Sequence, residues 1–474
     1  MELDKDLAAR QEARLLCHQA EAAQKLLATF SQEKLDAIVE NIAKKFSAAA
    51  DELAWMAVEE TGFGNATDKI TKNRFASETV AGAVRGMRTV GVLKERPQEK
   101  LWEIGVPVGV VAAIVPSTNP TSTICYKAMI ALKSGNAIVF SPHPKALECS
   151  LRAARIVAQA AVSAGAPVGC VGCLSFASMA GCQELMAAPE VRLILATGGP
   201  AMVRSAYSSG KPAIGVGAGN GPAYIHHSAD ISHALDCILR SKSFDNGTVC
   251  ASEQSIIVEK SMEQQVKQEA QRRGFYFMDT EEAGRLAKLL FRPNGTLNPE
   301  IVGKSADYLA KKAGFSVPCG TKVLVAREQE AGPTRPYSME KLCPVLAFFV
   351  MDSEDAVLEK AIEVLTHEGS GHTFAMHCND EDVIRRFALQ IPVSRFLVNT
   401  PAALGGIGAT TGLFPALTLG CGAVGGSSSS NNISPLDLIN IRRVAWGKDE
   451  CQTTHTVDAN LVELLTAKIM ERLK

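Results

Sequence analysis

The sequence predicts an α/β protein in which two doubly wound parallel sheets follow one another along the chain. Three observations support this fold class. Residues 5–90 show helical spacing of apolar side chains, residues 106–216 alternate short strands with helices, and a second alternating series runs from 221 to 398. Such alternation favours parallel sheets covered on both faces, because each crossover helix returns the chain to the same end of the sheet.

The N-terminal region is expected to be helical, and the first sheet follows it. Ser31 is of a residue type that caps helices, and Leu35, Ile38 and Ile42 follow it at helical spacing. Because such sheets bind ligands at the carboxyl ends of their strands, we expect a site at the carboxyl edge of the first sheet. The predicted strands are Val106–Val115, Ala137–Phe140, Val168–Leu174, Arg192–Thr197 and Ala213–Val216, and the predicted helices are Thr121–Lys133, Lys145–Ala164 and Ala177–Ala187.

The second series predicts a further sheet. Leu397–Pro435, at its end, has no charged residue and is rich in glycine and serine, but its leucines predict a packed loop near a site rather than a linker. The strands of the series are expected at Ser255–Val258, Lys322–Val325, Val345–Val350 and Arg395–Val398, with helices at Asp230–Lys242, Met262–Arg273, Glu282–Leu290 and Ser353–Leu365.

The pattern divides the chain into four parts. Residues 1–220 are predicted to form the first domain, 221–420 the second, 421–447 a segment that returns to the first, and 448–474 a polar linker followed by an amphipathic helix. The apolar row of that helix consists of Leu461, Leu465, Ile469 and Leu473 at a spacing of four.

The composition excludes several classes of function. The net charge is −1, which favours neither nucleic acid nor an acidic membrane surface. The 13 cysteines are scattered without paired metal-ligand spacing, so we expect no metal site. Unpaired thiols in this number indicate a reducing compartment, and the charged N-terminus has no signal-peptide core. We therefore expect a cytoplasmic protein without a membrane span.

Cys250 is the candidate nucleophile. It lies in a turn between a helical pattern that ends near Lys242 and the strand at Ser255–Val258. A thiol held on such a turn is reachable and is the most nucleophilic side chain near neutral pH. The competing interpretation is a small core residue, which describes most intracellular cysteines.

Asn119, His143 and His372 are further candidates, each with a structural alternative. Asn119 follows a strand, where its amide can donate to a developing oxyanion or can cap the next helix. His143, between Pro142 and Pro144, either faces a ligand or belongs to a rigid surface turn. His372 presents the same ambiguity.

The glycine cluster at Gly215–Gly221 does not match the ordinary dinucleotide-binding fingerprint. The third glycine of GxGxxG falls on Asn220 or Pro222, and the cluster lies too late in the strand series. The glycines still permit a close approach of the backbone to a ligand.

Taken together, the ordered motifs resemble the aldehyde dehydrogenase superfamily, specifically its CoA-acylating branch. The resemblance covers about residues 10–445 and is greatest to the N-terminal half of bifunctional aldehyde–alcohol dehydrogenases and to aldehyde dehydrogenases of bacterial microcompartments. The motifs that carry it are IVPSTNP, TGG, GVGAGNGP, FDNGTVC and EKLCPV, with TLGCGAVGG and LINIRRVA typical of the acylating branch.

The resemblance implies a role for each site residue and a variant Rossmann fold for the cofactor domain. Cys250 would be the nucleophile, and Asn119 with the Cys250 backbone N–H would form the oxyanion hole. Glu340 would hold a cofactor ribose. The remaining cofactor-binding residues implied are Thr197, Gly198, Gly199, Pro116, Ser141, His143 and Gly217.

One departure from the hydrolytic members is informative. Their motif carries a glutamate that activates the deacylating water, and here Val216 stands at that position. Valine cannot abstract a proton, so hydrolysis of a thioacyl-enzyme should be slow and the acyl group should pass to CoA. Ser141 and Pro144 replace residues that contact the adenosine ribose, which leaves NAD or NADP open.

The implied reaction is reversible NAD-dependent oxidation of a short aldehyde with CoA to acyl-CoA through a cysteine thioester. Acetaldehyde is the first choice of substrate, and propionaldehyde or a substituted two-carbon aldehyde remains open. The alternatives are a hydrolytic enzyme with a base from elsewhere and a catalytically silent scaffold. The resemblance further implies a homodimer or homotetramer with a small oligomerisation extension. The C-terminal helix is either an encapsulation peptide that binds a microcompartment shell protein or a helix packed within the enzyme.

Overall fold

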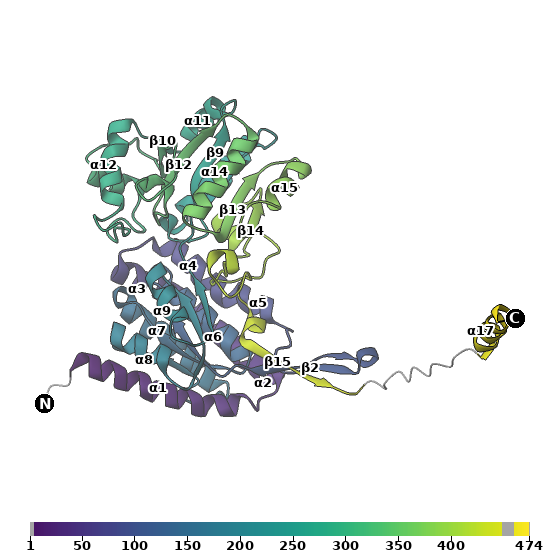
Figure 1. Cartoon of the computed structure of the whole chain (residues 1–474). Helices are drawn as coiled ribbons and strands as arrows, with labels where there is room; N and C mark the ends of the chain where they lie inside the picture. Colours follow the sequence, from purple (N-terminus) through teal and green to yellow (C-terminus); the bar gives the residue numbers. More distant parts are fainter. Residues whose placement is uncertain (1–3, 448–458, 474) are drawn as a thin grey trace.

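The computed structural model describes residues 4–447 and 459–473. Two α/β lobes are stacked on one another, and a narrow arm projects from the lower one (Figure 1). The structure has the α/β fold with parallel sheets that the sequence predicts. None of the helices in the described ranges is long and apolar enough to cross a lipid bilayer.

The N-terminal region is helical, as predicted. Ser31 caps the second helix by accepting a hydrogen bond from the Lys34 N–H. A π-helical stretch, Phe75–Thr79, lies between the fourth and fifth helices. The helices are α1 (Lys5–Leu27), α2 (Gln32–Ala48), α3 (Ala50–Thr61), α4 (Ala66–Arg74) and α5 (Val80–Val84).

The lower lobe contains a five-stranded parallel sheet in the order β5-β4-β3-β6-β7. The chain starts at the central strand, moves to one edge, and then returns to build the other side. Its topological switch point therefore lies between β3 and β6, the place where such sheets bind ligands. The strands are β3 (Val110–Ile114), β4 (Ala137–Ser141), β5 (Val171–Cys173), β6 (Val191–Thr197) and β7 (Ala213–Val216), and the helices are α6 (Pro120–Lys133), α7 (Leu147–Ser163), α8 (Met179–Ala187) and α9 (Pro200–Tyr207).

The stretch Val106–Val115, which we predicted as one strand, is two strands that belong to different sheets. Strand β2 ends at Pro107, and β3 begins at Val110. Gly109 between them has φ +130°, a conformation that side chains disfavour, and its N–H donates to the Asn136 side chain. The apolar run conceals this break, because Val106, Val108 and Val110 are alike in residue type on both sides of the turn.

The upper lobe contains a seven-stranded parallel sheet in the order β10-β11-β12-β9-β8-β13-β14. Its strands are β8 (Gly221–Ile225), β9 (Glu253–Glu259), β10 (Phe275–Phe277), β11 (Val323–Arg327), β12 (Val345–Met351), β13 (Gly371–His377) and β14 (Val393–Val398). Its helices are α10 (Ile231–Ser243), α11 (Glu263–Arg272), α12 (Thr280–Leu290), α13 (Ala306–Lys312), α14 (Glu354–His367), α15 (Glu381–Ala388) and α16 (Ala402–Gly406).

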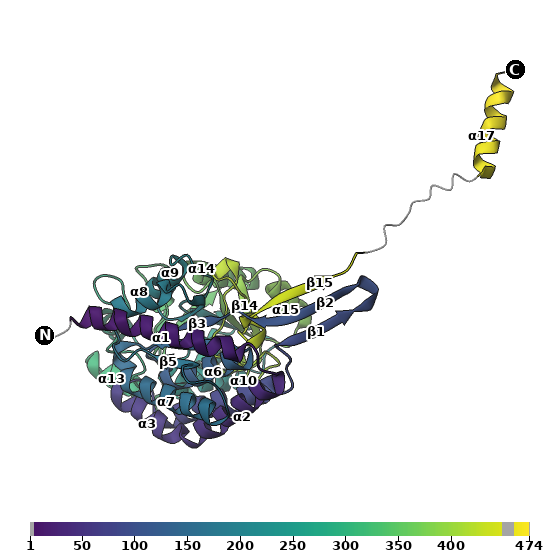
Figure 2. The ribbon, with the colours of Figure 1, turned by 90° about the horizontal axis from the view of Figure 1, so that it is seen from below.

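The arm is a three-stranded antiparallel sheet in which a late segment of the chain pairs with an early one. Strands β1 (Gly91–Arg96) and β2 (Leu101–Pro107) form a hairpin, and β15 (Ile439–Ala445) pairs along β2. Trp102 of β2 and Trp446 after β15 meet edge to face at 4.9 Å. Figure 2 shows the arm extending beyond the body of the molecule.

The predicted C-terminal helix is present as α17 (Ala459–Arg472) and stands away from the body in both views (Figures 1 and 2). Of its predicted apolar row, Leu465, Ile469 and Leu473 are exposed. The predicted polar linker over 448–458 lies outside the described residues.

Candidate active site

A cavity of about 250 Å³ lies where the two sheets face one another. Its lower wall consists of residues that follow β3, β6 and β7, as expected for the carboxyl edge of a parallel sheet. Its upper wall includes Cys250, which precedes β9 and therefore lies at the amino edge of the second sheet. Ile407, Leu417 and Leu419 close the cavity, so the uncharged Leu397–Pro435 segment is a packed loop near the site, as predicted.

Nine of the ten predicted site residues line this one cavity. Ser141 is the exception: it ends β4, a strand buried along its whole length, and its hydroxyl faces the Cys182 thiol of α8. Its predicted contact with a cofactor has no support from this geometry. The nine residues that come together are Pro116, Asn119, His143, Thr197, Gly198, Gly199, Gly217, Cys250 and Glu340.

Cys250 is positioned on a tight loop between the short helix Phe244–Gly247 and β9. Burial and, to a smaller extent, the carboxylate of Glu340 raise the pKa of its thiol to about 12, while Arg395 acts in the opposite direction. The loop packs closely on Gly219, where an added Cβ would lie 1.9 Å from the Cys250 carbonyl oxygen. One glycine of the 215–221 cluster is therefore required by the nucleophile loop itself.

Asn119 occupies the first position before α6, yet its side chain makes no capping hydrogen bond to that helix. Its amide oxygen instead accepts from the ammonium group of Lys72 at 2.5 Å. Asn119 therefore stands at the N-cap position, but its side chain does not cap the helix. Lys72 also lines the cavity and was missed by the sequence analysis, since nothing in the local pattern of α4 distinguishes it from a surface lysine.

Glu340 is the only carboxylate among the described residues that line the cavity. Its Oε1 atom accepts the Gly219 N–H at 2.8 Å. Burial, together with the neighbouring Glu368, raises the pKa of its carboxyl group to about 8. Near neutral pH this carboxyl group is therefore largely protonated.

The two candidate histidines have different positions. His143 lines the cavity, and its Nδ1 also accepts the Lys145 N–H, so it is both a turn residue and a cavity residue. His372 is fully buried in β13 behind Gly219, where its Nδ1 pairs with the Thr373 hydroxyl at 2.8 Å. Burial and Arg395 lower its pKa to about 3, so it is neutral.

The residues on the lower wall fit a nicotinamide dinucleotide. The Thr197 hydroxyl is buried and has no hydrogen-bond partner among the described residues, as expected of a group that meets a polar ligand. Gly199 and Gly217 face open space, so the backbone is accessible there. A neighbouring hollow of about 380 Å³ shares Pro200, Gly217 and Ala218 and reaches Cys421 of the TLGCGAVGG motif, which gives the nucleotide room to extend.

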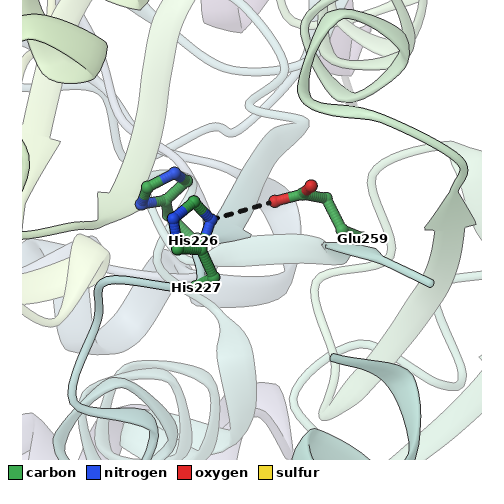
Figure 3. A group of neighbouring side chains, drawn as sticks. All are labelled: His226, His227 and Glu259. Atoms are coloured by element: carbon green, nitrogen blue, oxygen red, sulfur yellow. Dashed lines mark ion pairs between the residues drawn. The ribbon is translucent and has the colours of Figure 1, made fainter. Parts of the chain in front are cut away.

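A group of metal-ligand residue types lies at the opposite end of β8 from Cys250. His226, His227 and Glu259 lie side by side, and the dashed line in Figure 3 marks the pair between His227 and Glu259 at 3.6 Å. Both ring nitrogens of His226 already pair with other groups, Nδ1 with Ser228 and Nε2 with Glu354. The group is therefore a hydrogen-bonded cluster as it stands, separate from the cavity.

Comparison with known proteins places this chain and its fold in one family. A family model described as "Aldehyde dehydrogenase family" matches residues 4–274. The bifunctional aldehyde-alcohol dehydrogenase AdhE of Escherichia coli strain K12 is 44% identical over 92% of this chain and 49% of its own length. The chain thus spans about half the length of the curated relatives that it first matches.

Two solved structures share the whole architecture. An acetylating aldehyde dehydrogenase from Geobacillus thermoglucosidasius is 46% identical and has a TM-score of 0.93. The match covers 96% of this chain and 100% of the Geobacillus chain. A propionaldehyde dehydrogenase from the fucose utilisation microcompartment of Clostridium phytofermentans is 28% identical with a TM-score of 0.85, over 93% of this chain and 98% of its own.

The chain belongs to the aldehyde dehydrogenase family. Within that family it is a member of the CoA-acylating branch, homologous to the N-terminal half of the bifunctional aldehyde–alcohol dehydrogenases and to the microcompartment propionaldehyde dehydrogenases. Membership implies a nicotinamide dinucleotide and CoA. The roles of the individual site residues stay predictions.

The geometry around Cys250 yields a prediction about its reactivity. Glu340→Gln removes a carboxylate that raises the Cys250 pKa, so the thiolate should form at lower pH. We expect iodoacetamide to alkylate Cys250 roughly tenfold faster at about pH 9 than in the unchanged protein. Peptide mass spectrometry measures the rate at Cys250, with the exposed Cys319 as internal reference. An unchanged ratio between the two cysteines would refute this electrostatic coupling.

Proposed function

We propose that the protein catalyses the reversible, NAD-dependent oxidation of a short aldehyde with CoA to acyl-CoA through a thioester on Cys250. The observation that carries the proposal is the combination of Cys250 with Val216. The two residues line the same cavity, and Val216 is 2% exposed at the end of β7. The cavity therefore contains a nucleophile that can be acylated but lacks the glutamate with which hydrolytic relatives would release the acid.

In the proposed first half-reaction, the Cys250 sulfur attacks the aldehyde carbonyl and forms a thiohemiacetal. The Asn119 amide and the Cys250 backbone N–H donate to the developing oxyanion, which lowers the barrier. The nicotinamide cofactor supplies the hydride acceptor when bound, and one proton leaves to solvent. An acyl group remains attached to Cys250 as a thioester.

In the second half-reaction, the CoA thiolate attacks the thioester and Cys250 leaves as thiolate, so that acyl-CoA is the product. A thiol is acidic enough to supply thiolate without a strong base, whereas water is not. Cofactor and CoA each carry an adenine nucleotide, and the hollow beyond Gly217 and Ala218 offers a shared place for it. The two molecules would bind in turn.

Acetaldehyde is the proposed substrate, because the acetylating relative shares 46% identity and the whole architecture. Propionaldehyde is the second candidate, by similarity to the more distant microcompartment structure. NAD is proposed as the cofactor, and NADP remains the alternative, because neither of the residues that contact the ribose in hydrolytic relatives is present.

The defining test is nicotinamide reduction with acetaldehyde and NAD in the presence and absence of CoA. We expect turnover only with CoA, with acetyl-CoA as product, and loss of turnover in Cys250→Ala. Equal formation of acetate without CoA would instead indicate hydrolysis. Glu340, the one carboxylate described in the cavity, would then be the first candidate for the base, and Glu340→Gln would abolish that activity. Retained turnover in Cys250→Ala would overturn the site itself.

Val216 yields a second prediction. Val216→Glu should restore a base to the cavity and raise CoA-independent acetate formation at least about tenfold, because general base catalysis typically contributes more than that. Val216→Gln is the matched control, since it has similar size and polarity but cannot accept a proton. Acetate is measured after the acyl-enzyme has formed in the absence of CoA. An equal rise in both variants would show that water entry, not the base, limits hydrolysis.

We also propose that α17 is an encapsulation peptide and that the arm serves a homodimer or homotetramer. The helix exposes Leu464, Leu465, Ile469 and Met470. An exposed apolar face of this kind suits docking on a second protein, here a microcompartment shell protein.

The arm, which is proposed to join copies of the chain, also has exposed apolar side chains. They are Trp102, Ile441 and Trp446.

Deletion of residues 457–474 separates the two interpretations of the tail. We expect the truncated enzyme to keep its turnover number and its oligomeric state while it loses co-purification with shell proteins. Activity assays, light scattering and pull-down from cells that assemble shells measure the three properties. A loss of activity or of oligomerisation would show instead that α17 packs within the enzyme.

A further inference from the structure

A buried ionic cluster lies directly behind the cavity. The carboxylate of Asp245 is fully buried and pairs with two lysines of α4, Lys69 at 2.9 Å and Lys72 at 2.5 Å. Both lysines are less than 5% exposed. Burying three charges is costly, and even a well-formed buried ion pair adds little net stability. The stability of the fold therefore does not by itself account for this cluster.

The two lysines differ in what else they hold. Lys69 donates to the backbone carbonyl of Thr118 at 2.9 Å. Lys72 donates to the Asn119 side-chain oxygen at 2.5 Å and to the Thr248 hydroxyl at 3.0 Å. With Asp245 as third acceptor, all three N–H groups of Lys72 are committed.

The contact with Lys72 determines which end of the Asn119 amide faces the cavity. An ammonium group only donates, so the carboxamide oxygen must turn toward Lys72 and the NH₂ group away from it. One N–H of that group donates to the Thr118 hydroxyl at 3.1 Å, and the other is left for a ligand. An oxyanion hole needs this orientation, because a carboxamide oxygen in the same place would repel the developing charge.

The same cluster holds the loop of the nucleophile. Thr248, two residues before Cys250, donates to the Asp245 carboxylate at 2.6 Å and accepts from Lys72. Asp245 itself has φ +49°, a strained conformation for a residue other than glycine. Its Oδ1 also accepts the Asn65 N–H, and a Cβ at Gly64 would collide with that oxygen. Local strain of this kind persists only when the surrounding contacts maintain it.

We propose that Lys72 is a positioning residue: it fixes the amide orientation of Asn119, and its hydrogen bonds to Asp245 and Thr248 hold its own ammonium group in place. The proposal rests on the role of Asn119 in the proposed function. Lys69 anchors the same carboxylate without contacting Asn119. It therefore serves as the matched control within the same helix.

The experiment compares Lys72→Met with Lys69→Met. Each variant removes one buried ammonium group from Asp245, so we expect similar falls in melting temperature. The rate of Cys250 acylation, measured as the pre-steady-state burst of reduced cofactor with acetaldehyde, should fall between about ten- and a hundredfold in Lys72→Met and by less than about threefold in Lys69→Met. The loss should appear in the acylation rate rather than in the KM for NAD. Equal kinetic losses in the two variants would mean that the cluster is only structural.

A double-mutant cycle with Asn119→Ala provides the decisive readout. If Lys72 acts through Asn119, Lys72→Met should slow acylation by less than about twofold when Asn119 is already absent. If Lys72→Met slowed acylation as much in the Asn119→Ala protein as in the protein that retains Asn119, the proposal would be overturned. If Lys72→Met does not fold, Lys72→Arg retains a charged donor of different shape, and the same cycle applies to its smaller expected loss.

The positioning proposal and the proposed function can fail separately. p-Nitrophenyl acetate acylates a nucleophilic thiol through a tetrahedral oxyanion and releases p-nitrophenolate, without NAD or CoA. Suppose that no aldehyde is oxidised, but that Lys72→Met slows Cys250-dependent p-nitrophenolate release only when Asn119 is present. The proposed function then fails and the positioning role stands. If aldehydes are oxidised but the cycle is additive with both substrates, the positioning role fails alone.

Discussion

The nucleophile loop depends on one buried carboxylate. Asp245 lies where the helical N-terminal region meets the second sheet, and it binds groups from both: the Asn65 N–H, the ammonium groups of Lys69 and Lys72, and the Thr248 hydroxyl. Segments almost 180 residues apart in the chain therefore share one acceptor. Removing Asp245 would leave two buried ammonium groups without their shared carboxylate, and its hydrogen bonds tie the loop to α4.

The cavity joins unlike edges of two sheets. The first sheet contributes its carboxyl ends, the edge at which parallel sheets of this kind bind ligands. The second contributes the amino end of β9, so Cys250 points back across the junction. Close packing of Gly219 on the Cys250 carbonyl fixes the separation between the two walls. Val216 ends β7 and gives the cavity an apolar side chain at this point.

Sequence reasoning succeeded where local pattern and burial coincide. The strands β4, β6, β7, β9 and β12 each contain a short apolar run, and all were predicted within a few positions. It failed for β8 and β13. Strand β8 begins with Gly221 and Pro222, and β13 contains His372 and His377, residue types that are typical of turns or surfaces. Every residue of both strands is nevertheless buried, because their neighbours in the sheet lie far away in the sequence.

The sequence by itself determined the α/β class and the position of Cys250 on a turn before a strand, since each is a local property of residue type and spacing. The family resemblance added the significance of valine, in place of glutamate, at position 216. Only the tertiary structure decided that Lys72 contacts Asn119, that Ser141 is not among the residues lining the cavity, and that β2 pairs with β15 to form the arm. These features depend on contacts between residues distant in the sequence. A lysine on an amphipathic helix has the same local pattern whether it is solvated or holds a buried amide, and the packing of other segments against it makes the difference.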